Sequence, residues 1–433
     1  MAQHDMNLAN ADGATFRADL NSALAAIVSN NSGATAPSTT YAYQWWADTT
    51  ADRLKQRNAA NSAWIEVAVL STGAPVQLPA SASQAEMEAG TEAALRSMSP
   101  LRVAQAIAAL ATGGTAYGLF VKADPAAVAF TKTGAGTAQI KAGTKVDVSG
   151  TLVEFASATS ITMPTLTAGT DYAIWVKDDA TIQATTDFSS APAAGNWRKI
   201  GGFHYAPGGN ATGTSGGDTT PAINEYSFWD LKFRPACADP RGMTLVAGSF
   251  WTDIYLLGVD HLTNGTSKYN VTIADGSSPP KIPTKFGGNG STAYSTLNWW
   301  EANEVLQSWG KRSPTYDEFA ALAYGTTEAS SGGTDPTSTI LRNAYTSKWG
   351  VMLAAGNMWI WGYNFGGGAA GASWTANTGG RGSTYQMENA VRFGGYWGSA
   401  SDSGSRASLW NDSPAASSSS LGARGVCDHL ILD

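Results

Sequence analysis

Charge is scarce in this 433-residue chain. Acidic and basic residues make up 14% of it, whereas an ordinary soluble protein has about 25%. The net charge is −7, and the 27 lysines and arginines are scattered without a cluster. A nucleic-acid-binding protein needs a basic patch or stripe that meets the phosphate backbone. The sequence therefore excludes nucleic acid as a partner.

Cysteines and long apolar runs are also nearly absent. Cys237 and Cys427 are too few for a disulfide-stapled scaffold. No apolar run reaches the roughly 18 residues of a membrane span, so we expect no membrane insertion. The N-terminal stretch is polar and acidic, unlike a secretory signal, and we expect a soluble chain made in a cytoplasm. Buried free thiols are expected there, although a disulfide could form if the fold joins the two ends of the last zone.

Signatures of catalysis and of metal binding are missing as well. Four histidines lie far apart, without a zinc-protease pattern or Cys/His ligand spacing, and we expect polar surface or turn positions for them: His4, His204, His261 and His429. No G-x-S-x-G motif of a serine hydrolase occurs. GGGAAG at 366–371 fits a nucleotide-binding pattern, but no helix follows it, and we interpret it as an ordered glycine loop. We predict no catalytic residue, no metal site and no cofactor.

Glycine, tryptophan and small polar residues are abundant. The chain has 48 glycines and 16 tryptophans, and 43% of it is apolar. This apolar content excludes a wholly disordered chain, and the glycine-rich balance favours β-structure with long ordered loops. The length predicts two to four domains. Shifts in composition divide the chain into residues 1–78, 79–114, 115–225 and 226–433.

Residues 1–78 predict a small helix-plus-hairpin domain. Apolar residues recur there at helical spacing behind a cap: Phe16, Leu20, Leu24 and residues 27–28, with Asp12 or Thr15 as the cap. Two segments rich in aromatic and β-branched residues follow as strands, and NAANS at 58–62 turns the second into a hairpin. Four aromatic residues are many for so small a core, and they pack either against the helix or, in part, only against another chain: Tyr41, Trp45, Trp46 and Trp64.

Residues 79–114 predict a helical segment that joins chains together. The helix begins at Pro100, a residue favoured in the first helical turn, behind Ser97 and Ser99 as caps. A narrow apolar stripe follows at spacings of four and three: Val103, Ile107 and Leu110. So thin a stripe cannot bury itself in a monomer, and we predict the seam of a short coiled coil. The alternative is that the stripe packs on a neighbouring domain.

The two remaining zones differ in their patterns. In residues 115–225, short β-like runs alternate with turns about every ten residues, which predicts a small antiparallel sandwich or barrel. Residues 209–222 (GNATGTSGGDTTPA) then predict a linker. Residues 226–433 hold eleven of the 16 tryptophans.

Within this last zone, residues 299–310 and 313–325 have helical patterns, the second with a capping box of Thr315 and Glu318. Residues 349–364 predict two strands around a turn. Beyond them glycine and serine dominate, yet large aromatic residues still recur. We therefore expect an ordered loop region rather than a frayed end.

Two stretches of the sequence resemble bacteriophage tail fibres. LANADGATFRADLNSALAAIVSNNSGAT, followed by TTYAYQWWADTT, is similar to the N-terminal domain that attaches a fibre to the tail tip. SQAEMEAGTEAALRSMSPLRVAQAI, at 83–107, looks like a motif found before or between tail-fibre domains, which are usually trimeric. The resemblance implies a homotrimer with Val103, Ile107 and Leu110 at its seam. It also implies a tail-tip or baseplate protein as the partner of residues 1–78.

The last zone is similar to the C-type lectin-like domains of phage receptor-binding proteins and of the variable proteins of diversity-generating retroelements. GNMWIWGYN, at 356–364, stands where that family has its core tryptophan strand, and FGGYW, GSRAS and LGARGVCDH match its closing pattern. The resemblance implies a fixed set of frame residues: Gly394, Gly395, Trp397, Gly404, Arg406, Trp410, Gly422, Arg424, Gly425 and Cys427. Between them it implies positions that are free to vary: Tyr396, Ser399, Asp402, Leu409, Asn411, Asp412 and parts of 415–420.

The resemblance implies a multidomain, mainly β protein. We expect a helix-plus-hairpin domain, a short trimeric coiled coil, a β-sandwich and an α+β C-type lectin-like domain. We expect a tail-fibre adhesin that binds a pilus, an outer-membrane protein or a polysaccharide on the bacterial surface. Its receptor contacts would be Tyr396, Ser399, Asp402, Leu409, Asn411 and Asp412, with Tyr363 and Trp374 as neighbours. A polysaccharide-degrading tail enzyme and a purely structural tail spacer are the alternatives.

Overall fold

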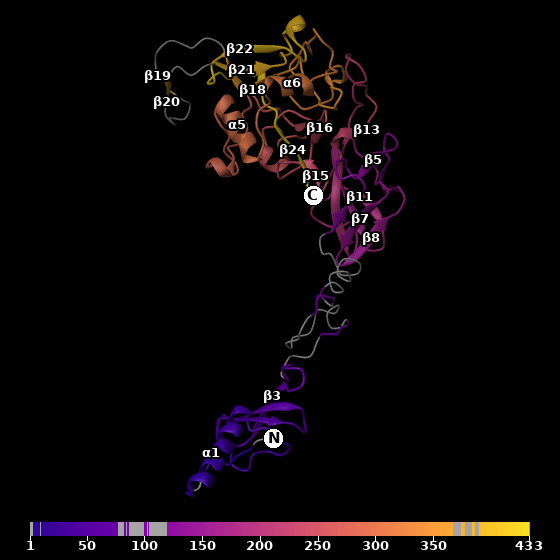
Figure 1. Cartoon of the computed structure of the whole chain (residues 1–433). Helices are drawn as coiled ribbons and strands as arrows, with labels where there is room; N and C mark the ends of the chain where they lie inside the picture. The colour runs from indigo at the N-terminus through magenta and orange to yellow at the C-terminus, as the bar shows by residue number, and fades with distance from the viewer. Residues whose placement is uncertain are drawn as a thin grey trace. The chain divides into compact units, whose positions relative to one another are not determined.

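The computed structural model describes residues 3–8, 10–76, 82–83, 85, 99–101, 103, 119–366, 374–376, 383–385 and 389–432 (Figure 1). The chain divides into two compact units, residues 1–114 and 115–433. Strands far outnumber helices in both described parts, which confirms the mainly β fold expected from the sequence. Within these described ranges, no helix has the length and apolar character that a membrane crossing needs.

The first unit contains helix α1 (Gly13–Val28) and a three-stranded antiparallel sheet. Helix α1 begins behind Asp12, whose carboxylate accepts hydrogen bonds from the amides of Ala14 and Thr15 at 2.9 and 3.0 Å. The strands are β1 (Trp45–Asp48), β2 (Arg53–Arg57) and β3 (Trp64–Val69), in that order across the sheet. The expected cap, helix and hairpin are confirmed.

The apolar stripe of α1 is not the face that this unit buries. Ala23 and Ala26 are the buried residues of the helix. Four residues of the stripe are exposed to between 40% and 85%: Phe16, Leu24, Ile27 and Val28. Of the four aromatic residues expected in the core, Trp46 is buried and its ring lies 5.3 Å from that of Trp64, whereas Tyr41 is 51% exposed.

The predicted coiled-coil seam lies mostly outside the described residues. Ile107 and Leu110 are not among them, nor is Ser97. The amide of Val103 donates to the carbonyl oxygen of Ser99 at 3.1 Å, the bond expected of a helix that starts at Pro100. Val103 is 39% exposed. The trimeric seam stays a prediction.

Residues 119–230 form a sandwich of antiparallel sheets, as expected. One sheet holds β4 (Phe120–Val121), β7 (Thr144–Val148) and β8 (Thr151–Phe155), and another holds β5 (Phe130–Lys132), β6 (Ala138–Ile140) and β9 (Thr159–Ser160). The largest holds β11 (Ile182–Thr185), β10 (Thr170–Lys177), β12 (Trp197–Ala206), β13 (Ala222–Ile223) and β14 (Trp229–Asp230). The three sheets bury one shared core, to which Val146, Phe130 and Ile174 each contribute from a different sheet.

The predicted linker at 209–222 is wrong. This segment is hydrogen-bonded along its length to the C-terminal part of the chain. The amide of Ala211 donates to Ser347 at 3.1 Å, Gly216 to Gly325 at 2.9 Å, and Gly217 to Asn343 at 2.8 Å. Small residues allow this close approach, because a Cβ atom on Gly216 would lie 2.4 Å from the carbonyl oxygen of Asn343. The small residues that are typical of a linker here allow one backbone segment to pack closely against another.

The C-terminal part contains two four-stranded sheets. The first has the order β15 (Phe233–Pro235), β24 (Val426–Ile431), β17 (Phe250–Asp253) and β16 (Met243–Val246), so the last strand of the chain lies beside the earliest strands of this region. The second has the order β22 (Ser408–Asp412), β21 (Asn389–Phe393), β18 (Trp359–Gly366) and β23 (Leu421–Gly422). A further pair joins β19 (Trp374–Ala376) and β20 (Ser383–Tyr385).

Short helices are interspersed with these strands along the chain. They are η1 (Glu225–Ser227), α4 (His261–Asn264), η2 (Thr284–Phe286), α5 (Trp299–Ser308), α6 (Tyr316–Leu322), η3 (Asn343–Tyr345) and η5 (Ala400–Asp402). Both helices expected from the sequence are confirmed. Ala302, Val305 and Leu306 of α5 are fully buried, and Thr315 and Glu318 form the capping box of α6.

The segment before β18 does not form the second strand expected there. The backbone of Gly350, Leu353 and Gly356 has positive φ angles of 78°, 49° and 67°, which a strand cannot contain. The segment is nevertheless buried: Val351 is fully covered, and its neighbours through Ala355 are nearly so. A buried apolar loop has the same composition as a buried strand, and periodicity cannot separate the two.

Candidate functional site

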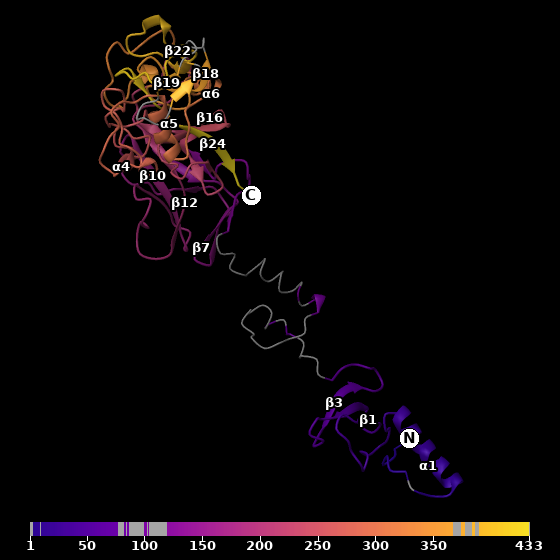
Figure 2. The ribbon, with the colours of Figure 1, turned by 90° about the vertical axis from the view of Figure 1, so that its left-hand side faces the viewer.

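The candidate receptor contacts lie on β18, on β22 and in the loop at 394–407, except for Trp374, which is on β19. Figures 1 and 2 show β18 and β22 at the opposite end of the second unit from β7. The loop is ordered, as expected, and Tyr396 anchors it through a parallel bridge to Asn357. The amide of Tyr396 donates to Ser399 Oγ at 3.1 Å, and the Tyr396 ring lies 5.3 Å from that of Trp397.

A bulge in β22 decides which of its side chains share a face. Ala390 pairs with Asp412 and Arg392 pairs with Leu409, so the register shifts between them. Ala390 and Arg392 lie two positions apart on β21 and therefore point to the same side of the sheet. Their cross-strand partners Asp412 and Leu409 join them on that side. Without the bulge, residues three apart on a strand would point to opposite sides.

Arg392 is a residue of the candidate face that the sequence did not reveal. Its Nε atom lies 2.8 Å from Oδ2 of Asp412, and its guanidinium lies 5.1 Å from the centre of the Trp359 ring. Burial raises the pKa of the Asp412 carboxyl, and the nearby Arg392 cation opposes this shift without cancelling it. An isolated arginine in a strand carries no signal of this role, because the role depends on the bulge.

The structure brings part of the expected set together. Tyr396 and Leu409 are half-buried against the same core cluster, which contains Trp359 and Trp361. The other candidates are solvent-facing to different degrees: Asp402 and Asn411 are exposed, Ser399 is intermediate, and Tyr363 is 51% exposed. The backbone of Trp374 pairs with Tyr385, while its side chain lies outside the described residues.

Several of the expected frame residues hold the loop in shape. Gly395 has φ of 82°, and a Cβ atom there would lie 2.3 Å from Ser403 Oγ. Trp410 packs on the opposite side of the sheet from Leu409, with its ring 5.8 Å from that of Tyr316. Arg406 departs from the expectation, because its side chain is exposed.

Arg424 is a frame residue that lies fully buried inside the C-terminal part. Its guanidinium donates to the carbonyl oxygens of Asp253 at 2.7 Å, Ile254 at 2.8 Å, Met352 at 2.6 Å and Leu353 at 3.3 Å. Burial lowers the pKa of this guanidinium to about 9. One side chain thereby ties the end of β17 to the irregular segment before β18.

The described residues do not assemble a metal centre. No group of three or more His, Cys, Asp or Glu side chains with suitable placement occurs among them. Two histidines nevertheless differ from the expected surface positions, since His204 and His261 are buried. His204 bridges Asp171 and the hydroxyl of Tyr255, each at 2.9 Å. This chain of polar groups joins the sandwich to the C-terminal region.

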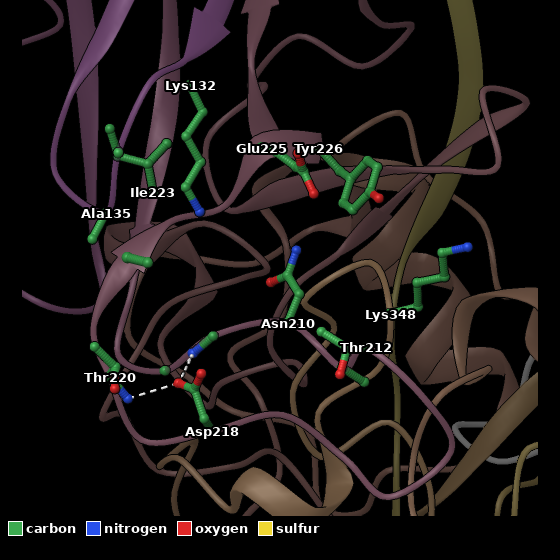
Figure 3. A pocket seen from close by; sticks show the side chains of 15 residues that line it. Lys132, Ala135, Asn210, Thr212, Asp218, Thr220, Ile223, Glu225, Tyr226 and Lys348 are labelled. Atoms are coloured by element: carbon green, nitrogen blue, oxygen red, sulfur yellow. Dashed lines mark hydrogen bonds between the residues drawn. The ribbon is translucent and has the colours of Figure 1, made fainter.

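A separate hollow of about 670 Å³ lies beside the segment at 209–222 (Figure 3). Lys132 and Lys348 contribute cations, and Asp218 contributes a carboxylate that accepts hydrogen bonds from the backbone amides of Gly209 and Thr220. None of the candidate receptor contacts lines it. The candidate face and this hollow are therefore distinct places on the molecule.

Comparison with known proteins identifies the family. Residues 128–230 match the family model described as the Mtd second domain. The tail fiber receptor-binding protein of Bordetella phage BPP-1 is 61% identical over 325 residues, which span 72% of this chain and 85% of that protein. The chain belongs to this family of phage tail-fibre receptor-binding proteins.

Solved structures of the same family agree with the fold. The Major Tropism Determinant U1 variant is 51% identical to this chain, with a TM-score of 0.72. The match covers 91% of this chain and 96% of the chain of the U1 variant. The M1 variant is 50% identical with the same TM-score and the same coverage. These matches confirm the expected mainly β architecture with a C-type lectin-like C-terminal domain.

Proposed function

We propose that this chain mediates adsorption of a phage to its bacterial host, as a virion component of the tail fibre. The observation that carries the proposal is the 61% identity to a tail fiber receptor-binding protein across 85% of that protein's length. The receptor would meet the face formed by β21, β22 and the loop at 394–407. Its contacts would be Tyr396, Ser399, Asp402, Leu409, Asn411 and Asp412, with Tyr363 and Trp374 beside them.

The chemistry of the face supports this role. The left-handed glycine Gly395 shapes the backbone of its loop, and the parallel bridge between Tyr396 and Asn357 fixes that loop to the segment before β18. Binding to a pre-ordered face avoids the entropy cost of ordering a loop. Half-buried Tyr396 and Leu409 offer apolar area, while exposed Asn411 offers hydrogen bonds. This division between rigid support and small adaptable contacts resembles that of antibody loops.

Assembly would increase the strength of attachment. A homotrimer joined at Val103, Ile107 and Leu110 would present three copies of the face, so that weak single sites combine into avid binding. Residues 1–78 would attach the fibre to a tail-tip or baseplate protein. The exposed apolar residues Phe16 and Ile27 of α1 are consistent with a surface that another protein chain covers.

A pull-down of the purified chain against bacterial surface fractions, with and without pili, tests the function. Recovery of a pilus protein, an outer-membrane protein or a polysaccharide supports adsorption and names the receptor class. No retention by any fraction of a host strain would contradict it.

Incubation with surface polysaccharide tests the enzymatic alternative, since release of oligosaccharides would show a degrading activity. The spacer alternative predicts that the fractions are not retained.

A further inference from the structure

Cys237 and Cys427 are brought opposite one another by the pairing of β15 with β24. Pro235 pairs with His429 in this antiparallel ladder. The ladder continues one residue further, because the amide of Ala236 donates to the carbonyl oxygen of Asp428 at 2.9 Å. The next pair in the same register is Cys237 with Cys427. Directly opposed residues in an antiparallel pair have Cβ atoms about 4.5–5.5 Å apart, close to the spacing across a disulfide.

Both cysteines are free thiols in a packed apolar cluster. Cys237 is 2% exposed and Cys427 is 4% exposed. The cluster around them contains Trp229, Met243 and Trp251. The Cys237 sulfur lies 3.2 Å from the carbonyl oxygen of Asp239 and 3.3 Å from the Met243 sulfur. The two thiols lie close enough for each to shift the pKa of the other.

The surroundings distinguish the two sulfurs. A hydrogen bond from the Cys237 side chain lowers the pKa of the Cys427 thiol, and the Cys237 amide and Lys311 act in the same direction. The same contact raises the pKa of Cys237. Lys311 is buried at 2.5 Å from Asp253, so its charge is held in place near both sulfurs. The directions of the two shifts favour Cys427 as the attacking thiolate.

We propose that Cys237 and Cys427 are an oxidation site that closes as one intramolecular disulfide when the protein meets a small disulfide such as oxidised glutathione. The Cys427 thiolate attacks the small disulfide and releases one small thiolate. Cys237 then loses its proton and attacks Cys427 in the mixed disulfide, which releases the second small thiolate. Two protein thiols and one small disulfide thus yield one protein disulfide and two small thiols.

The oxidant has a nearby point of entry. Residues directly after Cys237 in the chain line a surface hollow of about 630 Å³: Ala238, Asp239, Pro240 and Arg241. β15 is the edge strand of its sheet and has three residues. A local opening of this segment therefore uncovers both Cys237 and its neighbour Cys427 on β24, without unfolding the sheet.

The disulfide would lock the C-terminal region around the receptor face. The segments linked at Cys237 and Cys427 lie before and after all the candidate contacts in the chain. A bridge across so long a loop restricts the unfolded chain strongly, while the face itself is unchanged. The chain would be assembled with thiols in a reducing compartment and would gain its bridge in an oxidising medium.

Peptide mapping of the purified full chain, before and after exposure to oxidised glutathione, tests the site. We expect a peptide pair that joins Cys237 to Cys427 and a loss of both free thiols. We also expect a rise in Tm of at least about 4 °C that a reductant reverses. The variant Cys237→Ser is the control, and its Tm should not rise with the oxidant. Two alkylatable thiols after prolonged exposure, a persistent glutathione adduct or a bridge between chains would each overturn the proposal.

Discussion

Nε of Arg392 and Oδ2 of Asp412 lie 2.8 Å apart on the candidate receptor face. Both atoms are buried, yet neither makes a well-directed hydrogen bond within the described residues. The contact is thus an ion pair in which the N–H donor at Nε and the acceptor Oδ2 have not formed a hydrogen bond. A ligand group that reaches this pair would find a donor and an acceptor already desolvated and held in place.

The pH dependence of stability should reveal the environment of Asp412. Burial, the largest effect, raises the pKa of its carboxyl in the folded state. A raised folded pKa means that acid favours the folded form, and this contribution is lost as the pH rises through that pKa. Relative to the variant Asp412→Asn, the natural protein should therefore gain stability as the pH falls from 7 toward 4. Urea denaturation at both values measures the change.

The matched control for this experiment removes the cation. Arg392 is the group that opposes the rise in the Asp412 pKa. In an Arg392→Gln background, the same Asp412→Asn comparison should depend on pH at least as strongly. A stability difference that does not change with pH in either background would contradict the environment described for Asp412.

Replacement of Arg424 should be among the most damaging single changes. Arg424→Met removes the guanidinium donor from four buried backbone carbonyls, of which that of Ile254 keeps a second donor, the amide of Met352. We expect a loss of about 4 kcal/mol in the free energy of unfolding. Arg424→Lys should recover little of it, because one ammonium cannot span the planar fork of contacts. A loss below about 1 kcal/mol by urea denaturation would refute this role.

Gly395→Ala should strain the receptor loop in two ways, through the backbone conformation and through a steric clash. The residue has φ of 82°, and the added Cβ would lie 2.3 Å from Ser403 Oγ. Gly290→Ala provides the control, because its φ is 88° and a Cβ there meets no atom within 4 Å. We expect about 1 kcal/mol of destabilisation for the control and about 2–3 kcal/mol for Gly395→Ala. Equal losses in thermal denaturation would mean that the contact with Ser403 is easily relieved.

Local signals in the sequence anticipated much of the fold. The capping box at Thr315 and Glu318, the cap at Asp12 and the burial of Val305 follow from short-range patterns, and the structure has them. The structure of the segment at 209–222 could not be predicted from short-range patterns, because its hydrogen bonds depend on partners more than 100 residues away, such as Gly325. Composition cannot distinguish a free linker from a backbone held by distant chain segments.

The sequence predicted the ordered loop of the candidate site, but it did not predict the contacts of the neighbouring strands. The recurring tryptophans and glycines indicated an ordered loop, and Trp410 and Gly395 pack as such residues should. The pairing of Arg392 with Asp412 depends on a one-residue bulge, which changes the face of every side chain beyond it. The burial of His204 likewise depends on contact with Asp171 and Tyr255 across the unit.

Binding of purified protein to host cells tests the receptor face most directly. The double variant Tyr396→Ala with Asn411→Ala should bind a susceptible strain at least about tenfold more weakly than the natural chain, while its Tm stays within a few degrees. Tyr43→Ala, which removes an exposed tyrosine from the first unit, should bind like the natural chain. Undiminished binding by a folded double variant would contradict the assignment of the receptor site to this face.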